Sequence, residues 1–312
     1  MRDAVARAIT EQARLRDDLI VVVADISPAA ALRTFLDENP TRIVDVGVSE
    51  QAMIGMAAGL ALKGFRPFAY TIAPFAIFRP LEQIRVDLCY QELPVVVIGV
   101  GAGLSYSALG STHHTPEDIA IASALPNMTV VAPCDPAEVE AAVAGSFTLR
   151  GPMYLRTGKS GEPNLTGDAP EPFELGRIRL IAQQAGARTA VLSYGPIMDS
   201  VLNVLRTMSA MGPAGAADVY SVHTLKPLDT DRLDAILRSY DRVVVIEEHV
   251  GMGGLGMQVR ARAAGHGGAP EIRCLHLKDA FLHTYGSKDD LLAAHGITPA
   301  SIAAAMSGEA SP

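Results

Sequence analysis

Tryptophan is absent from this 312-residue chain, cysteine occurs only three times, and charged residues fill only 19% of the positions. Cys89, Cys134 and Cys274 are far apart and form no CxxC pair, so neither a disulfide framework nor a zinc site is expected. We expect three reduced, mostly buried thiols instead.

Basic clusters and long apolar runs are also lacking. The net charge is −8 and no block of lysine and arginine stands out, which argues against nucleic-acid binding through a basic face. The longest apolar runs, such as LPVVVIGVGAG, are too short and too interrupted by glycine to cross a bilayer, and the polar N-terminal segment has no signal-peptide core. We therefore expect a cytoplasmic protein that binds neither membranes nor nucleic acid.

The sequence is rich in apolar residues, at 49% of positions, and short β-branched runs alternate with helical patterns. Apolar strands flanked by helices predict parallel sheets covered on both faces. The expected strands are 19–25, 42–47, 65–70, 93–100, 128–133 and 153–156 in the first half, and 188–195, 217–223, 242–249 and 271–277 in the second.

A stretch rich in Gly, Pro and Asp, GKSGEPNLTGDAPEP at 158–172, separates the two halves and has no apolar periodicity. Such a composition predicts a linker or a long surface loop. We expect a first domain over 1–160, a linker over 161–185, and a second, smaller domain over 186–312. The predicted fold class is α/β, with two domains that are each a mostly parallel sheet covered by helices.

Glu50 lies where an apolar strand meets a small-residue helix, in VDVGVSEQAMIGMAAGLALKGFRPF. Buried carboxylates are uncommon because desolvation disfavours the charged form, so an enclosed Glu50 would have a raised pKa and could share a proton. The alternative is a helix-start acid after the N-cap residue Ser49, which is the commoner arrangement.

Phe75 and Phe78, in APFAIFRPLEQIR, are three residues apart and share a face if this segment is helical. Core packing is the ordinary explanation for such a pair, although aromatic rings also stack on flat heterocycles. Further on, GSTHHTPED at 110–118 places His113 and His114 on a glycine-led loop. Adjacent histidines rarely chelate one ion, and a neutral imidazole suits proton transfer.

Together these runs resemble the central part of transketolase, and the whole chain resembles the C-terminal half of that enzyme. The resemblance implies a thiamine-diphosphate-enzyme pyrimidine-binding fold followed by a transketolase C-terminal-like fold. It implies that Glu50 activates the cofactor by a hydrogen bond to a ring nitrogen of its aminopyrimidine. It further implies that Phe75 and Phe78 pack against the pyrimidine, and that His113 handles protons and oxygens of the substrate.

Two further site residues rest on the resemblance. Arg156, at the end of MYLR, matches an arginine that binds the substrate phosphate, although a surface arginine at a strand end is an equal alternative on sequence alone. Asp25, closing LIVVVAD, matches an acid near the cofactor, with a strand-end turn residue as the alternative.

The chain departs from the family pattern at several positions near the site. Leu109 stands where the family has an Asp that reads sugar hydroxyls, and Gly101 falls where it has a further substrate-binding His. Leu81 replaces a third aromatic, and His114 replaces a Gln. These departures put ordinary sugar specificity in doubt. The glycine-rich turn in EEHVGMGGLGMQV, with His249 near it, resembles the C-terminal domain and does not form a P-loop.

The family's metal motif, GDG followed about thirty residues later by Asn, is not found in this sequence, since the only GD pair, Gly167 and Asp168, continues as APEP. Mg²⁺ needs such oxygen ligands to bridge the two phosphates. The resemblance therefore implies that thiamine diphosphate is shared with a partner, an N-terminal transketolase subunit that carries the diphosphate and Mg²⁺ domain. Two copies of each chain are expected.

The leading hypothesis is the C-terminal subunit of a split transketolase, which transfers a two-carbon ketol unit from a ketose, as its phosphate, to an aldose. The first alternative is a beta subunit of a 2-oxoacid dehydrogenase or a decarboxylating enzyme like deoxyxylulose-phosphate synthase. The second alternative is a non-catalytic scaffold subunit. A nicotinamide-dependent oxidoreductase is disfavoured because VVVADISPAA stands where GxGxxG would be needed.

Overall fold

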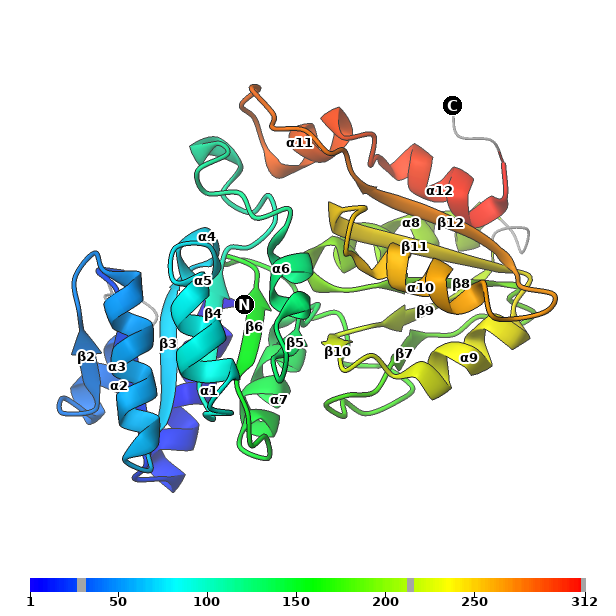
Figure 1. Cartoon of the computed structure of the whole chain (residues 1–312). Helices are drawn as coiled ribbons and strands as arrows, with labels where there is room; N and C mark the ends of the chain where they lie inside the picture. Colours follow the sequence, from blue (N-terminus) through cyan, green and yellow to red (C-terminus); the bar gives the residue numbers. More distant parts are fainter. Residues whose placement is uncertain (27–31, 212–215, 310–312) are drawn as a thin grey trace.

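The structure is a computed structural model that describes residues 1–26, 32–211 and 216–309, and it contains two sheets, each with helices on both faces (Figure 1). The larger sheet has the strand order β10-β5-β6-β4-β3-β1-β2. Its strands are β1 (Leu19–Val23), β2 (Ile43–Asp45), β3 (Arg66–Ile72), β4 (Val96–Val100), β5 (Thr129–Val131), β6 (Met153–Thr157) and β10 (Thr224–Lys226). All pair in parallel except β10, which is antiparallel to β5.

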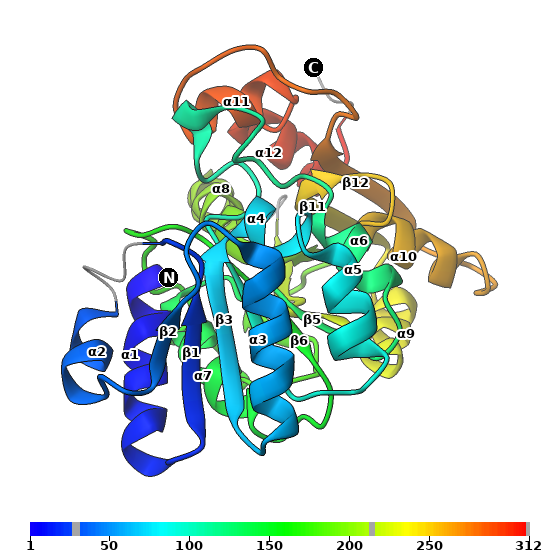
Figure 2. The same cartoon turned by 60° about the vertical axis from the view of Figure 1, so that its left-hand side comes forward.

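Helices cover both faces of this first sheet, because successive side chains on its strands point to opposite sides. Val22, Ala69 and Val97 pack on the face that carries α3, whereas Val21, Phe68 and Ile98 pack on the face of α1 and α7 (Figure 2). The helices are α1 (Arg2–Leu15), α2 (Arg33–Glu38), α3 (Glu50–Leu62), α4 (Ala73–Ile77), α5 (Leu81–Gln83), the π-helical η1 (Ile84–Cys89), the 3₁₀ turn η2 (Ser107–Leu109), α6 (Asp118–Ala124) and α7 (Pro136–Ser146).

The second sheet has the order β12-β11-β8-β9-β7. Its strands are β7 (Arg179–Ala182), β8 (Thr189–Ser193), β9 (Ala217–Ser221), β11 (Arg242–Val250) and β12 (Glu271–Leu277), of which only β7 is antiparallel to its neighbour. One face packs on α8 (Met198–Met211), α11 (Lys288–Ala294) and α12 (Pro299–Ser307), and the other on α9 (Thr230–Ser239) and α10 (Leu255–Ala263). A 3₁₀ turn, η3 (Gly195–Ile197), precedes α8.

Two short strands differ from the sequence-based prediction. β7 lies inside the 161–185 segment predicted as a linker and pairs with β9 of the second sheet. β10 was not predicted; it follows β9 in the chain yet completes the edge of the first sheet. Both are short antiparallel edge strands, which have too few residues for a recognisable apolar period. The run AALRTFLDEN at 30–39 has a helical pattern in the sequence; it lies partly outside the described residues, and its described part contains α2.

The connection between the halves is anchored rather than loose. Asp135 caps the N-terminus of α7 by accepting from the Glu138 N–H, at 2.8 Å. Its other oxygen accepts from the N–H groups of Leu165 and Thr166 and from the Thr166 hydroxyl, at 2.8 to 2.9 Å. A fully buried carboxylate therefore fixes this stretch against the first domain.

His223, between β9 and β10, is buried, and its ring stacks on Phe173 with the centroids 4.1 Å apart. Burial, with Arg179 nearby, lowers the pKa of His223 to about 3. Below pH 6.5, about the ordinary pKa of histidine, His223 binds a proton in the unfolded chain but stays neutral in the native chain. The contribution of His223 is therefore present above pH 6.5 and is lost as the pH falls from there toward 3.

We predict that this single residue costs about 1–2 kcal/mol of stability between pH 8 and pH 5. Urea denaturation at both pH values, for wild type and His223→Gln, measures the effect. The variant should lose less stability than wild type over this interval. Equal losses for the two proteins would contradict a neutral buried imidazole.

Candidate active site

The candidate site lies along one edge of the first sheet. β1, β2, β3 and β4 run parallel, so the segments that follow their carboxyl ends emerge side by side. Glu50 begins α3 after β2, Phe75 lies on α4 after β3, and His113 lies on the loop after β4. The sequence spacing alone did not show that these three residues meet.

Glu50 is the first residue of α3 and is only 5% exposed. The chain reaches it through a turn in which Gly47 has a φ of +70°, a conformation that favours glycine. Ser49 occupies the N-cap position without a side-chain capping hydrogen bond. Both sequence interpretations are thus partly met, since Glu50 starts a helix and is also enclosed.

Arg79, just after α4, is the partner of Glu50. Its Nη1 donates to Oε1 of Glu50 at 2.7 Å, and its guanidinium carbon lies 4.0 Å from the centre of the Phe75 ring. The Phe75 ring contacts the His113 ring edge-on, with centroids 5.2 Å apart. Glu50, Arg79, Phe75 and His113 therefore form one continuous cluster.

Arg79 was missed by the sequence analysis. The sequence does indicate that Arg79 lies near Phe75, because the two are four residues apart and an α-helical turn places such residues on one face. What the sequence could not show is that this face meets Glu50, since the two lie on different strand-to-helix connections.

His113 is partly buried and has Tyr106 as a second aromatic neighbour, 6.0 Å away between ring centroids. Its Nδ1 lies 3.0 Å from the Thr112 hydroxyl. Desolvation first, and the positive charge of Arg79 second, lower the pKa of His113 below its usual value. The imidazole is consequently neutral at pH 7 and can accept a proton or a hydrogen bond.

Phe78 and His114 face a neighbouring cavity of about 350 Å³ between the two domains. Its lining includes Glu117, Phe281 and His295. His114 is 6% exposed, and its Nε2 has no hydrogen-bond partner within the described residues. Phe75 thus belongs to the Glu50 cluster, whereas Phe78 lies partly buried beside it.

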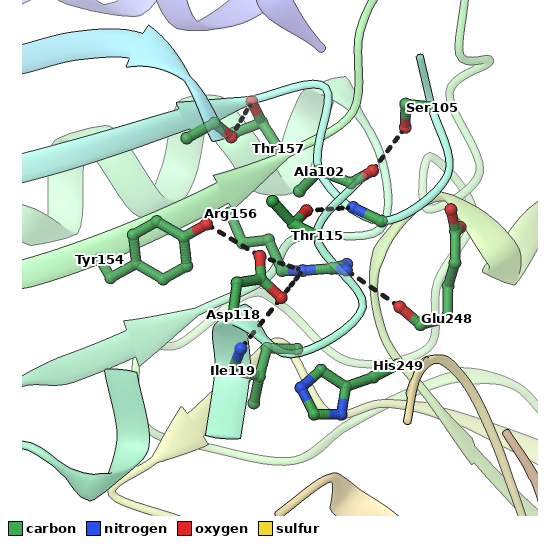
Figure 3. A network of polar contacts seen from close by, with 12 residues as sticks. Ala102, Ser105, Thr115, Asp118, Ile119, Tyr154, Arg156, Thr157, Glu248 and His249 are labelled. Atoms are coloured by element: carbon green, nitrogen blue, oxygen red, sulfur yellow. Dashed lines mark hydrogen bonds and ion pairs between the residues drawn. The ribbon is translucent and has the colours of Figure 1, made fainter. Parts of the chain in front are cut away.

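Arg156 does not lie where a substrate phosphate could reach it. It is 2% exposed, and its Nε donates to both carboxylate oxygens of Asp118, at 2.9 and 3.1 Å. Its Nη2 donates to the backbone carbonyl of Glu248, at 3.0 Å, and Tyr154 donates its hydroxyl to Asp118 (Figure 3). This geometry does not support the expected phosphate contact; the guanidinium instead joins the two domains.

Asp25 lies beside the turn that leads to Glu50. It is exposed at the end of β1, with a φ of +45°, and its N–H donates to Asp45 at 3.1 Å. The same Asp45 oxygen accepts from the Gly47 N–H, at 2.9 Å, so these residues shape the turn that leads to Glu50. The geometry agrees with the turn-residue alternative for Asp25.

Second-domain residues hold the loop that carries His113. Oε1 of Glu248 accepts from the Leu104 N–H at 2.5 Å, and Oε2 lies 2.7 Å from the Lys288 ammonium. Gly103 leaves room for this carboxylate, since an added Cβ would lie 2.5 Å from it. His249 is buried, and its Nε2 accepts a hydrogen bond from the Ala120 N–H, at 3.2 Å.

The positions that depart from the family pattern are now placed. Leu109 is 51% exposed on η2, and Gly101 has a φ of +69° with the Tyr106 ring packed against it. The N–H groups of Leu255 and Gly256, at the start of α10, are taken by the buried carboxylate of Glu247, at 2.8 and 2.9 Å. These N–H groups of the glycine-rich turn are therefore already paired with a carboxylate of the protein itself, Glu247.

Within residues 1–26, 32–211 and 216–309, no group of three or more His, Cys, Asp and Glu side chains is placed to hold a metal ion. The helices of that same part of the chain are also too short or too polar to span a bilayer. The candidate site consists of four side chains: the enclosed carboxylate of Glu50, the ring of Phe75, the guanidinium of Arg79 and the imidazole of His113.

This architecture is that of a chain with two α/β domains, each built on a mostly parallel sheet. Residues 1–163 match the family model described as "Transketolase, pyrimidine binding domain", and residues 179–302 match "Transketolase, C-terminal domain". The chain belongs to the transketolase family. The predicted family and the predicted fold class are both confirmed.

The relatives include both split and undivided proteins. One subunit of the apulose-4-phosphate transketolase of Actinobacillus succinogenes is 32% identical, over 91% of this chain and 90% of that protein. A solved structure titled "Split gene transketolase, inactive beta4 tetramer" is 32% identical, has a TM-score of 0.87, and matches over 98% of this chain and 97% of its own. The 1-deoxy-D-xylulose-5-phosphate synthase of Oleidesulfovibrio alaskensis is 32% identical over 91% of this chain, which covers 44% of that protein.

The buried ion pair between Asp118 and Arg156 predicts a large stability effect. Asp118→Asn keeps the shape but leaves Arg156 enclosed without a counter-ion, which should cost about 3–5 kcal/mol of unfolding free energy. Urea denaturation measures the loss. Glu140→Gln, which breaks the exposed pair with Arg7, is the control and should change little. The interdomain role is wrong if both variants are equally mild.

Proposed function

We propose that this chain is the C-terminal subunit of a split transketolase that uses thiamine diphosphate and moves a two-carbon ketol unit from a ketose, as its phosphate, to an aldose. The observation that carries the proposal is the enclosed carboxylate of Glu50, gathered with Phe75 and His113 in a chain of this family. A scaffold has no need to bury an acid beside an aromatic ring and a neutral imidazole.

The residues present fit the cofactor's ring. In this structure Glu50 and Phe75 already hold a flat, N–H-bearing cation, the guanidinium of Arg79. An aminopyrimidine offers the same planarity and a ring nitrogen for the carboxyl group. Glu50 would bind that nitrogen, and Phe75 and Phe78 would pack against the ring. Thiamine diphosphate supplies the carbanion chemistry when bound, and the protein supplies orientation and proton contacts.

His113 has the properties that the proposed substrate contacts need. Burial is the largest cause of the lowered pKa of His113 and leaves its imidazole neutral, so the ring can accept a proton from the substrate and return it. The loop that carries it is tied to the second domain through Leu104 and Glu248. This anchoring keeps the ring beside Phe75, where a bound substrate would meet it.

The proposal includes a separate N-terminal subunit that binds the diphosphate and Mg²⁺, with two copies of each chain in a cytoplasmic complex. It is supported by the Actinobacillus succinogenes relative, which is named as one subunit of a transketolase, and by the solved chain titled a split-gene transketolase. Sugar phosphates are the proposed substrates, in line with the relative named for apulose 4-phosphate. Because Arg156 is internal, the phosphate contact is left to other groups.

A decarboxylating synthase is the second candidate. It is favoured by the similarity to 1-deoxy-D-xylulose-5-phosphate synthase, which extends over 91% of this chain. The exposed Leu109, at the position of the family's sugar-reading Asp, also suits a changed substrate. Both candidate functions use the same cofactor and the same Glu50, and they differ in the donor substrate, which is a ketose for the transketolase and pyruvate for the synthase. A pyruvate-dependent reaction without ketose donor activity would favour the synthase.

We predict that Glu50→Gln abolishes turnover of the reconstituted complex, by at least about 100-fold, because the carboxyl proton contact is lost. Assembly of the complex, measured by size-exclusion chromatography, should be unchanged. Glu82→Gln removes an exposed acid on α5 and is the matched control, expected to retain full activity. Wild-type rates in Glu50→Gln would sink the mechanism.

Calorimetric titration of thiamine diphosphate with Mg²⁺ tests the shared site directly. We predict tight binding to this chain mixed with the product of the neighbouring gene, and weak or no binding to this chain alone, because the diphosphate and its metal would bind on the other subunit. Tight binding to this chain alone would contradict the split site. Absence of binding by the assembled pair would remove the cofactor from the proposal.

A further inference from the structure

Arg79 lies in the gap between the two groups proposed to hold the cofactor's ring. One guanidinium nitrogen is 2.7 Å from Oε1 of Glu50, and the guanidinium carbon is 4.0 Å from the centre of the Phe75 ring. The guanidinium thus makes one N–H contact with a carboxylate and one contact with an aromatic ring. A flat aminopyrimidine would contact the same two groups, packing its ring on Phe75 and accepting a hydrogen bond from the Glu50 carboxyl group at its ring nitrogen.

We propose that Arg79 is an internal substitute for the aminopyrimidine: its guanidinium fills the place of the ring in the free chain and is displaced when the cofactor binds. The proposal rests on the proposed function, since it takes thiamine diphosphate as the ligand. It makes Arg79 a positioning residue, which acts through Glu50 and Phe75.

The free chain needs such a substitute because Glu50 is only 5% exposed. An enclosed carboxylate without a partner is costly, and a charge-assisted hydrogen bond offsets that cost. Without Arg79 the carboxylate would keep no side-chain hydrogen bond among the described residues. The guanidinium keeps the acid in place until the ligand arrives.

Three features of the contact between Arg79 and Glu50 make it easy to break. The Arg79 side chain is 46% exposed, whereas that of Glu50 is 6% exposed, so the guanidinium can swing toward solvent while the acid stays. Glu50 is the only hydrogen-bond partner that Arg79 has among the described residues. The bond uses a single nitrogen rather than the paired, two-bond arrangement that makes arginine–carboxylate pairs strong.

Displacement has a measurable consequence. When the binding-competent form is only a fraction of the free protein, the apparent dissociation constant rises by the inverse of that fraction. Breaking the Arg79–Glu50 contact is such a preliminary step. Removing the guanidinium should therefore strengthen cofactor binding while weakening the free chain, two changes of opposite sign.

The test compares wild type, Arg79→Met and Arg79→Lys in two measurements. Methionine keeps an unbranched apolar side chain but removes the charge and the planar group; lysine keeps only the charge. Arg85→Met is the matched control, because Arg85 is an exposed arginine on η1 and its one ion pair among the described residues is with Glu82. Calorimetry gives the dissociation constant of thiamine diphosphate with Mg²⁺ for the reconstituted complex, and thermal unfolding gives the Tm of this chain alone.

For Arg79→Met we expect binding about five- to tenfold tighter than wild type, since about tenfold corresponds to the loss of one modest charged contact. We expect the Tm of the free chain to fall by about 2 °C. Arg79→Lys should lie between wild type and Arg79→Met, and Arg85→Met should match wild type in both measurements.

Unchanged or weaker binding by Arg79→Met, with wild type binding normally, overturns the displacement. Weaker binding together with a lower Tm would show a merely structural role. Failure of the wild-type complex to bind at all is a different result, because it overturns the proposed function itself. The two failures are therefore distinguishable in one set of titrations.

Discussion

The ion pair between Asp118 and Arg156 is the interaction on which the site depends. Asp118 begins α6 and so ends the loop that carries His113, while Arg156 comes from β6 and reaches the backbone of β11. The same loop is held near its start by Glu248. Both ends are thus fixed by buried charges that link the two domains. The position of a proposed substrate-binding histidine is in this way set by a domain that contributes no residue to the Glu50 cluster.

Glu50, Phe75 and His113 were singled out one by one from the family resemblance, and the structure adds the physical reason why they lie together. Each follows a strand of one parallel sheet, and such connections emerge at the same edge. Arg156 was assigned by analogy alone, and no local pattern reveals that its partner is Asp118, which lies 38 residues away in the chain. Arg79 was missed for a similar reason, since its meaning comes from a contact with Glu50 across 29 positions.

The fold was predictable to the same degree. The strands β1, β4 and β6 are buried throughout, and β1 and β4 appear in the sequence as continuous apolar runs. β7 and β10 have four and three residues, and they form only because a neighbouring strand offers an open edge. Asp135 makes a stretch of linker composition part of the first domain through three hydrogen bonds to Leu165 and Thr166, which amino-acid composition does not predict.

The place of β10 has a consequence for how this protein can be divided. The chain leaves the first sheet after β6, builds three strands of the second, and then returns to cover β5 before going on to α9. A fragment cut anywhere between β6 and β10 would leave β5 as a bare strand edge, which is a template for pairing with other chains. The two halves are separate in sequence, but β10 from the second half is a strand of the first sheet. Fusion of another protein at either end of this chain should therefore disturb the fold less than an insertion or cut in its apparent linker.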